Sequence, residues 1–292
     1  MEEFKDKMYG CYNPYRRTVK LEHIDRIVTI NCPCGKCYNC LRNYEKTWTM
    51  RMREEMANAR SSYFLTLTYD SQHVPIGDNE LLLCKSDYQK FLKRVRKRLS
   101  SCDISLRYVV VGEYGSNTSR PHYHMALFLD NKIPFNDFHK IIETSWELGF
   151  IELDYLNVKR IKYLVKYFNK LDRREHTVKY FRNMSNGIGK CFLTPRTVKY
   201  YKETLTTICK RYGYTYPMPR YYKDKIFDEI DKENLLIDAE VNYRSWLSAF
   251  HARHGRVRPT QHYKEVNETK LNRACIDGHI FNDDDSFLPF ES

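Results

Sequence analysis

The order of its hydrophobic patterns is the feature of this sequence that most constrains its fold. From residue 62 onward, stretches with strand-like alternation and stretches with helical spacing of apolar residues follow one another as β-α-β-β-α-β-α. The expected strands are residues 63–69, 106–114, 121–129 and 150–156, and the expected helices are residues 86–99, 134–148 and 158–171. This order predicts an α+β fold with a split βαβ, RRM- or ferredoxin-like antiparallel sheet, with helices on one face and the other face free.

Two further regions flank this pattern. A Cys-rich segment precedes it, with a short expected strand at residues 24–30 and an expected helix at residues 39–59. The C-terminal region is expected to be mainly helical, with a helix at residues 221–250 and a disordered acidic tail around residues 282–286. We therefore expect three parts: a Cys-rich segment and helix at 1–60, the sheet domain at 61–200 and the helical region at 201–292.

Charge and hydropathy narrow the class of partner. The chain of 292 residues has 49 Lys and Arg against 37 Asp and Glu, a formal net charge of +12. Its apolar runs are only as long as strands, and its first residues, MEEFKDK, contain no secretion signal. We expect an intracellular protein that binds no membrane and whose partner is a polyanion such as a nucleic acid.

Four of the ten cysteines form a C-x-C-x2-C-x2-C cluster, made of Cys32, Cys34, Cys37 and Cys40. Four thiolates on one short loop suit a structural Zn²⁺ ion. Cys32 and Cys34 would point to opposite sides of an extended chain, so Cys11 could replace one of them. An iron–sulfur cluster and a metal-free Cys-rich turn remain alternatives.

Two histidines at alternate positions, His122 and His124, predict a catalytic metal site. On a strand both imidazoles project to the same face, while Tyr123 points to the opposite face. Glu113 lies on the strand expected to pair with this one in the antiparallel sense. Two imidazoles and a carboxylate leave coordination positions open and suit Mg²⁺ or Mn²⁺.

Two tyrosines one helical turn apart, Tyr163 and Tyr167, are candidates for catalysis. Lys166 and Lys170 each follow one of the tyrosines by three residues and share their face of the expected helix. A lysine lowers the cost of forming a phenolate and neutralises charge that develops on a phosphate, as attack on a phosphodiester requires. The alternative is an amphipathic helix whose tyrosines belong to the core.

These motifs together resemble those of the HUH endonuclease superfamily. Residues 64–68 are similar to its first motif, and the strand with His122 and His124 is similar to its metal motif. Residues 163–170 are similar to its two-tyrosine motif. The chain is most similar to the rolling-circle replication initiators of small single-stranded DNA phages of the microvirus group, and its Cys-rich segment resembles the gokushovirus branch.

The resemblance implies a metal-assisted nick in single-stranded DNA at the replication origin, in the cytoplasm of a bacterial host. One tyrosine would form a 5′-phosphotyrosyl bond and release a 3′-OH primer, and the second would act when the circle is closed. We assign the first role to Tyr163 and the second to Tyr167. Host helicase and polymerase are the expected protein partners. Two basic residues close to the motifs are expected to bind DNA, Arg120 and Lys162.

Other functions remain open. A relaxase or a single-strand transposase of the same superfamily would use the same motifs on a different DNA target. From another class, a non-catalytic, metal-stabilised nucleic-acid-binding protein would use the sheet for base stacking and its basic rim for phosphates. A regulator built on the Cys cluster would need a recognition helix, for which the sequence offers no clear candidate.

Overall fold

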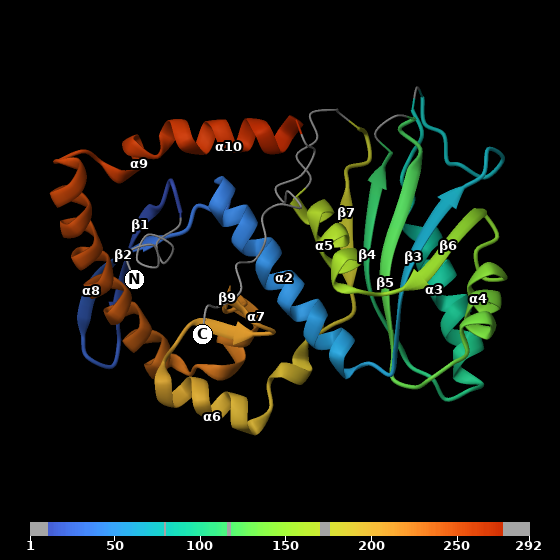
Figure 1. The fold of residues 1–292 in the computed structure, drawn as a ribbon, viewed down its shortest axis with the longest axis horizontal. Helices are drawn as coiled ribbons and strands as arrows, with labels where there is room; N and C mark the ends of the chain where they lie inside the picture. Colours follow the sequence, from blue (N-terminus) through green and yellow to red (C-terminus); the bar gives the residue numbers. More distant parts are fainter. Residues whose placement is uncertain (1–10, 79, 116–117, 170–175, 277–292) are drawn as a thin grey trace. The chain divides into compact units, whose positions relative to one another are not determined.

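The computed structural model describes residues 11–78, 80–115, 118–169 and 176–276 (Figure 1). Contacts between residues divide the chain into two units. One unit combines Met1–Trp48 with Leu193–Ser292, and the other is Thr49–Phe192. The division into three parts that the sequence suggested stays a prediction.

The second unit is built on a five-stranded antiparallel sheet. Its strands lie in the order β6-β3-β5-β4-β7. They are β3 (Ser61–Tyr69), β4 (Leu106–Tyr114), β5 (Pro121–Leu129), β6 (Gly149–Tyr155) and β7 (Phe181–Met184). The predicted α+β class with an antiparallel sheet is confirmed. The bounds of β4 and β5 are those expected from the sequence, whereas β7 was not anticipated.

The main core lies between one face of this sheet and two helices, α3 (Lys85–Ser100) and α4 (Phe135–Glu143). Alternate residues of β3 enter this core, and Phe91 and Ile142 meet them from the helices. The helix α4 ends earlier than expected because the hydroxyls of Thr144 and Ser145 donate hydrogen bonds to carbonyls of its last turn. The remaining alternate positions of the strands face the other side of the sheet.

The helix α5 (Val158–Lys166) lies against that second face, which the sequence had led us to expect to be free. Its start is fixed by Asn157, whose side chain accepts a hydrogen bond from the Arg160 amide at 3.0 Å. Its apolar side is buried: Ile161, Leu164 and Val165. A 3₁₀ turn, Tyr167–Asn169, continues the helix and also contacts β4. The amphipathic character that marks α5 as helical therefore also places it on the sheet.

The helix α2 (Tyr38–Asn58) crosses the division between the two units. In the sheet unit its Met50 and Met52 are fully buried. Glu55 pairs with Arg107 of β4 and accepts a hydrogen bond from the Gly189 amide. The methionines of this helix are thus packing residues, as expected.

The other unit joins an N-terminal hairpin to the C-terminal helices. In the hairpin, β1 (Tyr15–Leu21) pairs with β2 (Arg26–Cys32), which contacts α8 (Glu229–His254). A break replaces the single helix expected at residues 221–250, because Asp228 forms a capping box that starts α8. The unit also contains α6 (Pro195–Thr204), β8 (Ile208–Arg211), β9 (Tyr214–Pro217), α7 (Arg220–Ile226), α9 (Pro259–His262) and α10 (Lys264–Ile276). The acidic tail predicted around residue 284 lies outside the described residues.

Within the described ranges, no helix has both the length and the apolar character needed to cross a membrane.

Candidate active site

The strand register brings the three predicted metal ligands to one place. Glu113 of β4 lies opposite His122 of β5, so both side chains project to the same face of the sheet. His124 lies two residues further along β5 on this face, with its ring centroid 6.3 Å from that of His122. Glu113 and His124 are both buried, and Glu113 Oε1 lies 3.0 Å from His124 Nε2.

Two threonines of β3 hold the imidazoles from behind. Thr66 lies opposite His124 and Thr68 opposite His122. Their hydroxyl oxygens form hydrogen bonds with the Nδ1 atoms at 3.1 Å and 3.0 Å respectively. Such contacts orient a ligating histidine and leave its Nε2 atom for the ligand. The motif strand at residues 64–68 therefore has a physical role, which is to position the histidines.

A glycine leaves room beside His122. A Cβ atom on Gly115 would lie 3.1 Å from His122 Nε2, closer than an ordinary van der Waals contact. Imidazole nitrogens, a buried carboxylate and open space next to one of the nitrogens form a donor set that fits a divalent cation. The side chains around this position therefore suit the metal that the motifs imply.

The two tyrosines of the α5 region lie over His124. The ring centroid of Tyr163 is 5.4 Å from that of His124, and the ring of Tyr167 stacks on His124 at 5.3 Å. The Tyr167 hydroxyl donates a hydrogen bond to the Tyr163 hydroxyl at 2.6 Å. Tyr163 is 41 % exposed, whereas Tyr167 is more buried.

The surroundings of the tyrosines disfavour their ionised forms. Burial raises the pKa of Tyr163, although the hydrogen bond from Tyr167 acts in the opposite direction. Burial, and then the charge of Glu113, raise the pKa of Tyr167 further. A cation between the carboxylate and the phenols would reverse the second effect.

These side chains line a pocket of about 380 Å³. Its lining consists of Thr66, Thr68, Glu113, Gly115, His122, His124, Glu152, Tyr163 and Tyr167. Glu152 is a residue that sequence reasoning missed. Alternation along β6 indicates which face it occupies, but only the register, which sets it opposite Thr66, brings it to this pocket.

The predicted basic residues lie outside the lining of this pocket. Lys162 and Lys166 are half-buried residues of α5. Arg120 donates hydrogen bonds to the Tyr69 carbonyl at 2.7 Å and to the Ser71 hydroxyl at 3.2 Å, which ties the end of β3 to the start of β5. Lys170 lies outside the described residues. The catalytic or DNA-binding roles of these four residues stay predictions.

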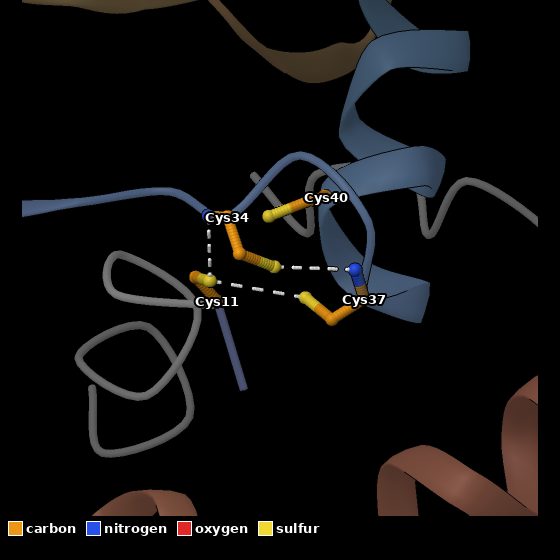
Figure 2. A group of neighbouring side chains, drawn as sticks. All are labelled: Cys11, Cys34, Cys37 and Cys40. Carbon is orange, nitrogen blue, oxygen red and sulfur yellow. Dashed lines mark hydrogen bonds between the residues drawn. The ribbon is translucent and has the colours of Figure 1, made fainter. Parts of the chain in front are cut away.

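A second group of candidate metal ligands lies in the other unit (Figure 2). The sulfur atoms of Cys11, Cys34, Cys37 and Cys40 all lie within 4.8 Å of one another. Cys32, which the spacing had suggested as a ligand, is not in this group, and Cys11 occupies its place. The reason is the strand: Cys32 is the last residue of β2 and pairs with Tyr15. The group is suited to bind a metal ion.

Comparison with known proteins agrees with the motifs. Residues 62–172 match the family model of the replication-associated protein ORF2. The chain is 26 % identical over 230 residues to replication-associated protein ORF2 of Spiroplasma virus 4, with 71 % of each chain covered. It is 27 % identical over 241 residues to replication-associated protein VP4 of Bdellovibrio phage phiMH2K, with 73 % of each chain covered.

The chain resembles phage replication-associated proteins. A third relative, replication-associated protein ORF4 of Chlamydia phage 1, is 26 % identical over 271 residues, which cover 84 % of this chain and 63 % of that protein. The predicted resemblance to microvirus-type replication initiators is confirmed. The family match includes both histidines and both tyrosines of the pocket.

Proposed function

We propose that this chain is a metal-dependent endonuclease and strand transferase that nicks single-stranded DNA at a phage origin to start and end rolling-circle replication. The observation that carries the proposal is the pair of hydrogen-bonded phenols over His124, in the pocket that also holds His122 and Glu113. Similarity to replication-associated proteins supports the role in replication.

The chemistry depends on the tyrosine oxygen. The phenol of Tyr163 loses its proton, and its oxygen attacks the scissile phosphorus. The bond from phosphorus to the 3′ oxygen breaks, and that oxygen gains a proton to become the 3′-OH primer. One phosphodiester replaces another, so the bond energy is kept and no nucleotide cofactor is required. Joining is the same reaction in reverse, with a 3′-OH as the attacking group.

The metal ligands in this proposal are His122, His124 and Glu113, and the ion is Mg²⁺ or Mn²⁺. When bound, the ion would withdraw negative charge from the oxygens of the scissile phosphate. The threonines keep both imidazoles in a fixed orientation. Glu152 adds a carboxylate at the border of the pocket, and Lys166 and Lys170 are proposed to offset the charge of the phosphate and phenolate.

The two tyrosines are proposed to act in turn. Tyr163 begins because it is the more exposed phenol and accepts the hydrogen bond from Tyr167. Tyr167 cuts the regenerated origin after one round of synthesis. The freed 3′-OH then attacks the first adduct and closes the circle. Host helicase and polymerase would supply unwinding and synthesis, in the cytoplasm of the host.

A denaturing gel tests the proposal. Full-length protein is incubated with Mn²⁺ and end-labelled single-stranded oligonucleotides that tile the cognate phage genome. A covalent adduct that survives SDS is expected on oligonucleotides from the origin. The matched control is the double variant Tyr163→Phe with Tyr167→Phe, which keeps both rings and lacks both nucleophilic oxygens. No adduct across the whole genome would contradict the proposal, and adducts only on plasmid-transfer or transposon-end sequences would favour a relaxase or a transposase.

A further inference from the structure

We propose that Cys11, Cys34, Cys37 and Cys40 bind one structural Zn²⁺ ion, which fastens the N-terminal segment to the start of α2. Zinc–sulfur bonds of about 2.3 Å in a tetrahedron place the sulfurs roughly 3.8 Å apart. The Cys37 and Cys11 sulfurs are 3.9 Å apart, and all four lie within 4.8 Å of one another. A cluster of several irons would put more atoms between the cysteines and separate them further, so these distances favour a single ion.

Backbone amides already surround the sulfurs as they do around bound thiolates. The amide of Cys34 donates to Cys11 Sγ at 3.2 Å, and the amide of Cys37 donates to Cys34 Sγ at 3.3 Å. The amide of Tyr12 donates to Cys37 Sγ at 3.4 Å. Such donors stabilise negative charge on sulfur and fix the direction of the ligands.

The chain between Cys34 and Cys37 is folded for this purpose. Gly35 has a φ of +72° and no atom within 4 Å of the position its Cβ would take. This left-handed conformation lets the chain reverse so that both sulfurs face the same point, and glycine adopts it without strain. Cys40 follows in the first turn of α2, beside Cys37 (Figure 2).

The fourth ligand gives the site its structural meaning. Cys11 precedes Cys34 by 23 residues, and the β1–β2 hairpin lies between them. An ion held by all four cysteines therefore ties the base of the hairpin to the first turn of α2. Because structural zinc contributes directly to folding free energy, its loss should loosen this segment.

The sequence supplies a matched control in Cys32. It lies two residues from Cys34, and the structure leaves it out of the group. Full-length Cys11→Ser and Cys32→Ser variants are purified under reducing, chelator-free conditions, and zinc is measured by elemental analysis. We expect about one zinc per chain in the wild type and in Cys32→Ser, and at least tenfold weaker zinc retention in Cys11→Ser during dialysis against a mild chelator.

Two measurements keep the proposal testable if Cys11→Ser fails to fold. In wild-type protein, Co²⁺ should replace zinc and give the intense absorption of a tetrahedral thiolate site, unchanged in Cys32→Ser. Strong chelation should make residues 11–40 more sensitive to limited proteolysis. Zinc lost from Cys32→Ser but kept in Cys11→Ser would overturn the ligand set. Wild-type protein that takes up neither zinc nor cobalt, or that contains stoichiometric iron, would overturn the site.

A separate observation concerns the border of the active-site pocket, and the inference drawn from it rests on the proposed function. Phe150 of the edge strand β6 is 68 % exposed. It lies opposite Thr68, which lies opposite His122, so the Phe150 ring projects from the face that carries the site. Among the described residues it has no aromatic contact. We infer that Phe150 stacks on a base of the DNA strand next to the scissile phosphate.

Tyr155 is the matched control for Phe150. It lies on the same strand and is 62 % exposed, but it projects from the opposite face, where it stacks with Tyr63. We expect Phe150→Ala to weaken single-stranded DNA binding by roughly 5- to 100-fold and to raise KM, with the adduct rate at saturating DNA little changed. Phe150→Trp should restore binding, and Tyr155→Ala should bind like the wild type.

The outcomes separate this inference from the proposed function. If the wild type forms no adduct on any DNA, the proposed function fails. If the wild type forms adducts and Phe150→Ala has the same KM, the stacking role is wrong. Equal losses in Phe150→Ala and Tyr155→Ala would also overturn it, because they would indicate a general effect on β6.

Discussion

The phenol of Tyr167 donates its hydrogen bond directly to the phenol oxygen of Tyr163, across 2.6 Å, above the imidazole of His124. The two candidate nucleophiles therefore share one position in the pocket. Only one of them has its oxygen available to a phosphate at a time, since the other holds it through the shared proton. This arrangement suits two sequential reactions at one metal site.

The first prediction concerns the division of labour between these residues. Tyr163→Phe should reduce adduct formation by more than about 100-fold, because phenylalanine keeps the packing and removes only the nucleophile. Tyr167→Phe should still form the adduct and should release few closed circles. Denaturing gels of labelled origin DNA and circle-closure assays measure both. Inverted phenotypes would reverse the roles, and wild-type behaviour of both variants would place the nucleophile elsewhere.

The second prediction concerns the metal ligands. His122→Ala, His124→Ala, Glu113→Gln and chelation should each lower nicking by more than about 100-fold. DNA binding should be largely kept, because it depends mainly on phosphate contacts to the basic surface. Adduct gels and binding assays at fixed salt check the two effects. His139→Ala is the control, since His139 is a part-exposed histidine of α4 outside the pocket. Wild-type nicking by His124→Ala would show that the metal site is wrongly placed.

The third prediction concerns the threonines behind the histidines. Thr66→Val and Thr68→Val keep the side-chain shape and remove the hydroxyl that meets Nδ1. Each should weaken metal affinity or activity by roughly 10- to 100-fold. Thr66→Ser and Thr68→Ser keep the hydroxyl and should stay close to the wild type. Mn²⁺ titration of nicking gives the affinities. Equal loss in the serine and valine variants would point to packing rather than to the hydrogen bond.

The fourth prediction tests the space beside His122. Gly115→Ala puts a methyl group 3.1 Å from His122 Nε2, so the ring must move by a few tenths of an ångström. We expect a higher Mn²⁺ requirement for nicking, with little change in thermal stability. Gly77→Ala is an equally tight control away from the site, because its Cβ would meet only Leu82 at 3.1 Å. An unchanged Mn²⁺ requirement in Gly115→Ala would show that this space is not used.

Some features of the site follow from local periodicity, and the sequence suffices for these. Alternation gives the bounds of β4 and β5 and places His122 and His124 on one face of their strand. Helical spacing puts Tyr163 and Tyr167 on one side of α5. The order of strands and helices, read the same way, gives the α+β class.

Other features depend on residues that are distant in the chain, and only the tertiary structure decides them. The strand register places Glu113 opposite His122 and brings Glu152 to the pocket. The burial of its apolar side sets α5 on the second face, where its tyrosines meet His124. Among the cysteines, spacing favoured Cys32, but the folded hairpin brings Cys11 to the group. Periodicity fixes which side a residue faces, whereas its partners across a sheet or a loop are fixed by packing of the whole unit.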